Sequence, residues 1–367
     1  MPVISPRVRL LNPQARTSSF APPSATEDRL SDLHDFGDNP GKLRARCYVP
    51  PGIAASAPLV VVLHGCTQNA AVYDHGSGWS RLADRHGFIL LFPEQQRANN
   101  PMLCFNWFAA EHTRRDAGEA GSIRAMIAAM QQKHGVDPQR IFVTGLSAGG
   151  AMASAMLATY PELFAGGAIV AGVAYGSASS VAEAFECMGG RKGRSASELG
   201  RSARAASRHG GPWPRVQIWQ GGADYTVVPS NGEAIVQQWV NVHGLDAEPH
   251  RRDAIAGHAR QAWLSADGTV LIEHVLVSGM AHGVPLATGG DDPTGVAGAH
   301  MLEVGIDSTG RIAAFFGIAP ATEEASAPRI AAAPAPLPTL PSSGEIPAPN
   351  GPQQVIERAL RAAGLMS

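Results

Sequence analysis

Short apolar runs alternate with longer helical stretches between residues 41 and 318, and this alternation most restricts the folds open to the chain. The segments "LRARCYV", "PLVVVLHG", "FILLFPE" and "RIFVTG" are typical of strands. The segments "GWSRLADRHG" and "DAGEAGSIRAMIAAMQQKHG" are typical of helices, the second with Asp116 as its N-cap. An uninterrupted apolar run such as 59–63 suits a strand covered on both faces. The pattern therefore predicts βαβ units and a doubly wound, mostly parallel α/β sheet.

The two ends of the chain differ from this central domain in composition. Residues 1–40 are polar and interrupted by proline and glycine, so we expect a partly disordered surface arm. More than half of residues 319–352 are alanine or proline, which predicts an extended, flexible linker. Apolar residues at helical spacing in residues 353–367 predict a short amphipathic C-terminal helix. That helix docks either on its own domain or on a partner or polymer surface.

Composition and charge exclude several classes of protein. The hydrophobic content of 44% suffices for a large core, and a net charge of −2 lacks the basic excess of a nucleic-acid-binding protein. No stretch reaches the roughly 20 apolar residues of a transmembrane helix. The N-terminal residues show no apolar signal-peptide core, and four cysteines in 367 residues do not define a redox compartment. Cytoplasmic and exported locations therefore both stay open.

The segment "VTGLSAGGAMA" contains Gly145, Ser147 and Gly149 in a G-x-S-x-G pattern. A chain with 41 glycines can produce this pattern by accident, so its surroundings decide its meaning. An apolar strand precedes the serine and a helix of small residues follows it, which is the context of a nucleophile elbow. The N-terminus of that helix would direct backbone N–H groups at the site. We therefore interpret Ser147 as a nucleophile.

A serine nucleophile needs a general base and a carboxylate that orients the base. Asp224 follows the strand "RVQIWQG" and His282 follows the strand "TVLIEHVLV", so both are expected at the carboxyl edge of the sheet. The order Ser147, Asp224, His282 is that of an α/β-hydrolase triad. The alternatives are a turn aspartate and a structural histidine.

An oxyanion hole would complete such a site. Its first donor is expected to be the N–H of Ala148, which follows the nucleophile, and the second comes from the loop after an earlier strand. The segment "LHGCTQ" supplies that loop, where Gly65 lets the backbone turn inward and Cys66 offers its N–H. The alternative is an ordinary turn at the end of a strand.

In their order along the chain, six segments resemble the poly(3-hydroxybutyrate) depolymerase family of esterases, which are α/β-hydrolases related to feruloyl and acetylxylan esterases. The segments are "LHGCTQ", "CFNWF", "GLSAGGAMA", "GADYTVVPSNG", "GMAHGVPL" and "VGIDSTGRIAAFFGI". The resemblance covers about residues 41–318 and implies Ser147, Asp224 and His282 as the triad, beside the two oxyanion amides. It implies hydrolysis of a poly(3-hydroxybutyrate)-type polyester, or of its oligomers, through an acyl-enzyme. The family includes secreted enzymes.

Two other functions stay open. One is an esterase of the feruloyl or acetylxylan type, and the other is an α/β-hydrolase-like protein that binds without catalysis. The expected partner is a polyester or small ester, with no nucleic acid. No cofactor and no metal is expected, because acyl transfer by a serine needs neither. The chain also has no H-E-x-x-H, paired C-x-x-C or P-loop motif.

Two features bear on the substrate. The loop "MLCFNWF" places Phe105 and Trp107 near the top of the sheet, and together with Tyr225 they are candidates for substrate contact. A buried core position is the alternative for Trp107. The resemblance also favours a disulfide between Cys66 and Cys104, with two free buried thiols as the alternative.

A lid-like insertion at residues 173–212 follows the strand after the nucleophile helix. Its segment 191–208 contains six lysines and arginines against one glutamate. These basic residues either form a rim over the site that attracts acidic products or belong to an ordinary solvated surface.

Overall fold

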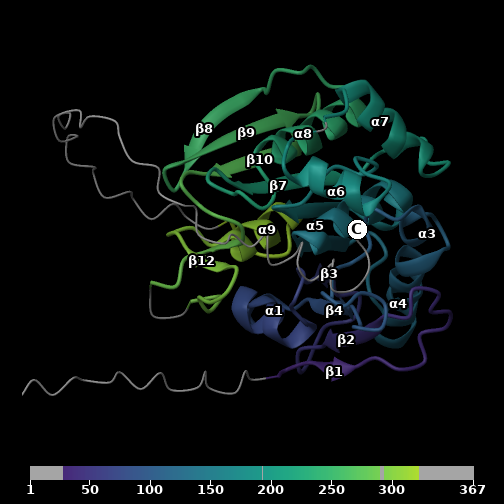
Figure 1. Ribbon diagram of the computed structural model, residues 1–367. Coiled ribbons are helices and arrows are strands. Elements are labelled where there is room, and N and C mark those ends of the chain that lie inside the picture. Colours follow the sequence, from purple (N-terminus) through teal and green to yellow (C-terminus); the bar gives the residue numbers. More distant parts are fainter. Residues whose placement is uncertain (1–27, 192, 290–292, 322–367) are drawn as a thin grey trace, which may run out of the picture.

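The structure, a computed structural model, describes residues 28–191, 193–289 and 293–321 (Figure 1). The C-terminal helix expected at residues 353–367 and nearly all of the linker expected at residues 319–352 lie outside the described residues. In the part of the chain that is described, no helix has both the length and the apolar character needed to cross a bilayer.

A ten-stranded sheet runs through the described part of the molecule, in the order β1-β2-β4-β3-β5-β6-β7-β10-β9-β8. The neighbours from β4 to β10 are parallel, and the pairs at both edges are antiparallel. The doubly wound, mostly parallel sheet predicted from the alternation is therefore confirmed. The strands are β1 (Ser31–Asp32), β2 (Arg44–Tyr48), β3 (Leu59–Leu63), β4 (Ile89–Glu94), β5 (Ile141–Leu146), β6 (Gly166–Val170), β7 (Arg215–Gly221), β8 (Arg251–Ile255), β9 (His258–Leu264) and β10 (Val270–Val277).

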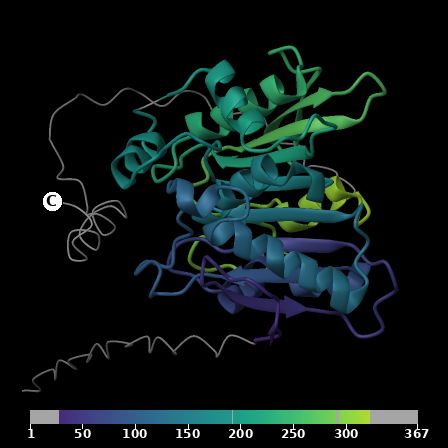
Figure 2. The ribbon, with the colours of Figure 1, turned by 90° about the vertical axis from the view of Figure 1, so that its right-hand side faces the viewer.

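Helices cover both faces of this sheet, and Figure 2 shows several of them lying across the face nearest the viewer. In β3, Val61 packs in the hydrophobic cluster that includes α4, α5 and α8, whereas Val60 packs in the cluster that includes α1, α2 and α9. A short parallel pair, β11 (Val284–Leu286) and β12 (Met301–Glu303), lies outside the main sheet. The helices are α1 (Ala70–Ser77), α2 (Trp79–His86), α3 (Ala110–Thr113), α4 (Gly118–His134), α5 (Ala148–Thr159), α6 (Val181–Met188), α7 (Ala196–Ala205), α8 (Ser230–His243) and α9 (Ser308–Phe316), with a 3-10 turn at Pro161–Leu163.

The N-terminal arm expected at residues 1–40 is partly built into the sheet. Its described part, residues 28–40, contains β1, which pairs antiparallel with β2. From the same segment, Arg29 donates a hydrogen bond to the hydroxyl of Tyr48 at 2.8 Å and forms an ion pair with Asp84. These contacts cover the edge that β2 would otherwise expose.

The helix α4 begins later than the sequence pattern suggests. Its first residue is Gly118, and Asp116 lies outside it with a φ of 57°, so the expectation that Asp116 is the N-cap is wrong. The cause is that the chain passes close to the backbone of Glu111 where it enters the helix. A Cβ on Gly118 would lie 2.3 Å from the carbonyl oxygen of Glu111, so this approach needs a glycine.

The side chains of two histidines are shielded from solvent, one in the sheet and one in a helix beside it. His274 in β10 is buried, and His243 at the end of α8 packs against the ring of Trp239, with 6.1 Å between ring centroids. Desolvation lowers the pKa of each imidazole to about 4. Both side chains are therefore neutral at pH 7.

Candidate active site

Ser147 lies at the sharp turn between β5 and α5. Its φ of 57° and ψ of −119° are strained for a residue with a side chain. The turn is possible because a glycine follows two residues later. A Cβ on Gly149 would lie 2.3 Å from the carbonyl oxygen of Leu63 in β3. Among the described residues the hydroxyl of Ser147 has no hydrogen-bond partner, and the residue lines a cavity, so the hydroxyl is free to meet a ligand.

Asp224 and His282 follow the neighbouring strands β7 and β10, and His282 lines the same cavity as Ser147. Nδ1 of His282 lies 2.7 Å from Oδ2 of Asp224, whose exposed fraction is 1%. The second oxygen, Oδ1, accepts hydrogen bonds from the backbone N–H groups of Thr226 and Val227, at 2.8 and 2.9 Å. The carboxylate is thus held in one orientation. It keeps the imidazole proton on Nδ1 and leaves Nε2 as an acceptor.

Two backbone amides near Ser147 are free to donate. Cys66 follows β3 and lines the cavity, and Ala148 is the first residue of α5, where amides have no acceptor within the helix. Neither N–H meets an acceptor in the described part of the chain. Two unpaired amides close to a serine nucleophile can stabilise an oxyanion.

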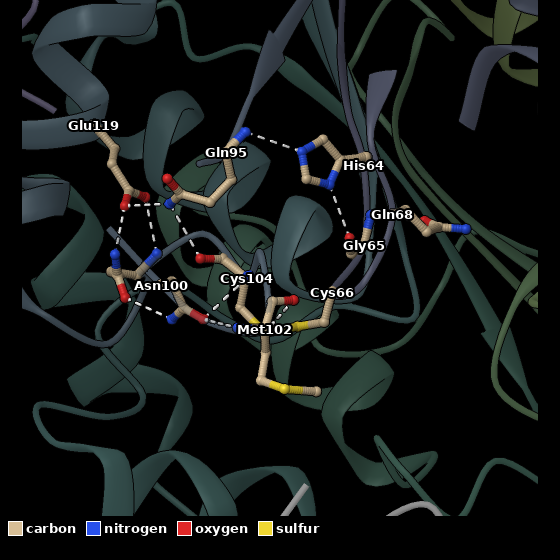
Figure 3. The surroundings of a disulfide bond; sticks show 10 residues. His64, Gly65, Cys66, Gln68, Gln95, Asn100, Met102, Cys104 and Glu119 are labelled. Atoms are coloured by element: carbon tan, nitrogen blue, oxygen red, sulfur yellow. Dashed lines mark hydrogen bonds between the residues drawn. A yellow bond between two sulfur atoms is a disulfide. The ribbon is translucent and has the colours of Figure 1, made fainter. Parts of the chain in front are cut away.

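His64 holds the peptide group between Gly65 and Cys66 (Figure 3). Its Nδ1 donates to the carbonyl oxygen of Gly65 at 2.8 Å, and its Nε2 accepts from the N–H of Gln95 at 3.1 Å. Burial lowers the pKa of this imidazole, so the ring is neutral. In a trans peptide the C=O and N–H groups point in opposite directions. The bond to Gly65 therefore turns the N–H of Cys66 away from His64, a role that the sequence motif did not indicate.

A disulfide joins Cys66 to Cys104 and so ties the loop after β3 to the loop after β4 (Figure 3). A backbone hydrogen bond from the N–H of Thr67 to the carbonyl oxygen of Met102, at 2.7 Å, lies beside it. The two loops therefore form one connected wall of the site. The free cysteines are Cys47 and Cys187, and both are buried.

A buried carboxylate anchors the second loop from the inside. Glu119, in the first turn of α4, is fully buried and accepts hydrogen bonds from the backbone and side-chain amides of Asn106, at 2.8 and 2.6 Å, and from Nε2 of Gln95, at 2.7 Å. Desolvation raises its pKa to about 7, although the three donors act in the opposite direction. Sequence reasoning missed this residue, because glutamate in a first helical turn is ordinarily solvated.

The cavity beside Ser147 has a volume of about 550 Å³ and mainly apolar walls. Helix α6, from the insertion at residues 173–212, forms one of them, whereas none of the described basic residues of 191–208 lines the cavity. In the described residues no group of three or more His, Cys, Asp or Glu side chains is placed to hold a metal ion. The apolar lining residues are Pro101, Met102, Trp107, Phe108, Ala109, Leu146, Val181, Ala184, Phe185 and Met188.

Of the three aromatic residues expected to contact substrate, Trp107 lines the cavity and the other two do not. Phe105 is fully buried against the ring of His64, with 5.0 Å between centroids, because the anchored Asn106 turns its neighbour into the core. Tyr225 is 85% exposed and lies outside the lining, because Asp224 turns inward and the next side chain faces solvent. The expectation that Phe105 contacts substrate is therefore wrong, and substrate contact by Tyr225 stays a prediction.

Replacement of Cys104 by serine is expected to lower the free energy of unfolding by about 3–4 kcal/mol, because the disulfide closes a long loop. The two cysteines are 38 positions apart in the sequence. Urea denaturation followed by tryptophan fluorescence measures the change. The double variant Cys66→Ser/Cys104→Ser should be destabilised by a similar amount, since either change removes the same bond. Unchanged stability in both variants would contradict a native disulfide.

Comparison with known proteins identifies relatives of this chain. A family model described as "Esterase PHB depolymerase" matches residues 43–262. Poly(3-hydroxyalkanoate) depolymerase C of Paucimonas lemoignei is 45% identical over 291 residues, which cover 79% of this chain and 70% of the relative. An acetylxylan esterase of Coprinopsis cinerea is 33% identical over 270 residues, which cover 72% of this chain and 71% of the relative.

Among solved structures, an acetyl xylan esterase from Aspergillus awamori is similar to this chain, with a TM-score of 0.67 and 26% sequence identity. The alignment covers 79% of this chain and 99% of the other. The two proteins therefore share a fold over nearly the whole length of the acetyl xylan esterase.

Proposed function

This chain belongs to the esterase PHB depolymerase family and is a carboxylic ester hydrolase, and we propose that it cleaves poly(3-hydroxybutyrate)-type polyesters or their oligomers. In this proposal Ser147 is the nucleophile, His282 the general base and Asp224 the carboxylate that orients the base. The short contact between Asp224 and His282 supports the assignment, as does the position of Ser147 at a strained turn on the cavity wall.

The reaction would proceed in two acyl-transfer steps. Oγ of Ser147 attacks the ester carbonyl while Nε2 of His282 takes its proton, and the histidine then passes that proton to the leaving alcohol. Water, deprotonated by the same nitrogen, attacks the acyl-enzyme and releases the acid and the serine. Asp224 stabilises the imidazolium that forms in each step. Its fixed carboxylate needs no reorganisation for this, because two backbone amides already hold it.

The negative charge that develops on the carbonyl oxygen would be met by the N–H groups of Cys66 and Ala148. Both amides are unpaired among the described residues, so they lose no existing hydrogen bond when the oxyanion forms. The bond from His64 to Gly65 and the disulfide to Cys104 hold Cys66 from two directions. Such preorganised donors are worth about 3 kcal/mol each in comparable enzymes.

The size and apolar character of the cavity favour a polyester chain over an acetyl group as substrate. An acetyl group is small and would leave most of the 550 Å³ unfilled, so the apolar walls would contribute little to binding. A hydroxyalkanoate chain repeats a methyl-bearing unit and can cover more of those walls. Trp107 and Phe185, which both line the cavity, offer it aromatic surface.

An acetylxylan esterase activity is the second candidate. Its specific support is the similarity in fold to the acetyl xylan esterase from Aspergillus awamori, which extends over 99% of that chain. Activity on acetyl groups would use the same triad and oxyanion amides, and only the groups filling the cavity would differ.

A substrate panel tests the choice. At pH 8 the protein is expected to clear a suspension of poly(3-hydroxybutyrate) and to hydrolyse soluble 3-hydroxybutyrate oligomers with a kcat/KM at least about tenfold above that for acetate release from acetylated xylan. Turbidity and titration of released acid measure the two reactions. Acetate release without any hydrolysis of polymer or oligomers would instead establish the second candidate.

A further inference from the structure

The cavity wall formed by residues 99–112 has few polar groups left for a ligand. The indole N–H of Trp107 can only donate, and Glu111 is exposed to solvent. The ring of His112, which is partly buried in this wall, can still accept a hydrogen bond from a ligand. The amide side chains of Asn100 and Asn106 are bonded within the protein through both nitrogen and oxygen, whereas Asn99 is bonded through its NH₂ group alone.

His112, in α3, stands between the cavity and the buried carboxylate of Glu119. Its ring lines the cavity with 27% of the side chain exposed, whereas Nδ1 is buried and has no hydrogen-bond partner among the described residues. Nδ1 lies 3.5 Å from Oε1 of Glu119. This is longer than a good hydrogen bond but close enough for the carboxylate to attract a proton to Nδ1. The bond from Gln95 keeps Glu119 in place (Figure 3).

The position of that proton decides what His112 offers to a ligand. A neutral imidazole with its proton on Nδ1 has Nε2 as an acceptor, and Nε2 lies on the side of the ring away from Glu119. Burial lowers the pKa of His112 and raises the pKa of Glu119 to about 7. At pH 8 the ring is therefore neutral and the carboxylate is charged. A neutral acceptor in a mainly apolar cavity favours a ligand group that donates.

We propose that His112, positioned by Glu119, binds the free hydroxyl end of a hydroxyalkanoate oligomer. The inference rests on the polyester function proposed above. Ester groups along such a chain only accept hydrogen bonds, and the acid end is a carboxylate at neutral pH. The terminal hydroxyl is thus the one donor that the chain offers to Nε2. His112 therefore sets the direction in which an oligomer enters the cavity.

Capping that hydroxyl provides the test. KM is measured at pH 8 for 3-hydroxybutyrate oligomers from dimer to tetramer, each with a free hydroxyl and as its O-methyl ether. For at least one oligomer length, the KM of the wild type is expected to be about five- to tenfold lower for the free oligomer than for its O-methyl ether. This ratio corresponds to the free energy of one neutral hydrogen bond. His112→Phe keeps a ring without nitrogen and should bring the ratio close to one. His112→Gln restores an acceptor and should recover part of the ratio.

Controls separate this result from more general effects. His86→Phe makes the same change on α2, outside the cavity lining, and should keep the wild-type ratio. Equal KM values for free and capped oligomers in the wild type would overturn the inference and leave the polyester function standing. A wild type that hydrolyses p-nitrophenyl butyrate but no oligomer would overturn the polyester function itself.

Sugar hydroxyls offer the same donor chemistry, so acetylated xylo-oligosaccharides form a second arm of the test. If His112→Phe raises KM only for these sugars, the bound hydroxyl belongs to a sugar and the assignment to the polyester end is overturned. If the effect is confined to uncapped hydroxyalkanoate oligomers, the proposal is supported.

Discussion

Replacement of Ser147 by alanine is expected to lower kcat by about six orders of magnitude on every ester that the wild type hydrolyses. Alanine cannot form the acyl-enzyme, and the pair of Asp224 and His282 is then left without a hydroxyl to deprotonate. The free amides and the cavity remain, so substrate binding should change little. Steady-state hydrolysis of p-nitrophenyl butyrate measures the loss, and intact mass after treatment with a fluorophosphonate measures covalent labelling.

A serine of the helix that follows Ser147 provides a matched control. Ser154 lies in α5, is buried, and its hydroxyl has no hydrogen-bond partner among the described residues. Ser154→Ala should therefore keep the kcat and the labelling of the wild type, because no bond is lost. If the Ser147→Ala protein still takes up one fluorophosphonate per chain, another residue is the nucleophile and the proposed triad is wrong.

Asp224→Asn is expected to lower kcat by about four orders of magnitude with little change in KM. Oδ1 of Asp224 already accepts from the amides of Thr226 and Val227, so an asparagine would place its oxygen there and turn its NH₂ group toward His282. Nδ1 would then have to accept, and the imidazole proton would move to Nε2. A protonated Nε2 cannot take the proton of Ser147, so the base is lost while the shape of the site is kept.

The tautomer can be followed directly. Nitrogen NMR of labelled histidine should show the proton of His282 on Nδ1 in the wild type and on Nε2 in Asp224→Asn. Asp246→Asn makes the same chemical change at an exposed residue and should leave both kcat and the spectrum unaltered. An Asp224→Asn enzyme with nearly full kcat would remove Asp224 from the mechanism.

The parallel core of the sheet could be predicted because its central strands consist mainly of apolar residues. The strands β3, β4 and β5 are buried at every position, which is what a strand covered on both faces requires. The edge hairpin of β8 and β9 could not be predicted in this way. Four of the five side chains of β8 are exposed, so backbone hydrogen bonds hold the strand and no apolar run marks it.

Ser147, Asp224 and His282 could be proposed because each follows a strand at the carboxyl edge of a parallel sheet, a position that local sequence indicates. The direction of a side chain within an irregular loop has no comparable signal. Phe105 lies in the core and Trp107 in the cavity wall, although only one residue separates them. That residue is Asn106, and its bonds to Glu119 decide which way each neighbour points.

His243 at the end of α8 and His274 in β10 make the stability of this enzyme depend on the acid that it produces. Each ester cleaved at neutral pH yields a carboxylate and releases a proton. His243 and His274 have pKa values of about 4 in the folded chain against 6.5 for an ordinary imidazole. As the pH falls from 6.5 toward 4, the unfolded chain binds protons that the folded chain does not, so stability is lost. In a weakly buffered medium, the acid released by turnover would therefore lower the free energy of unfolding of the enzyme.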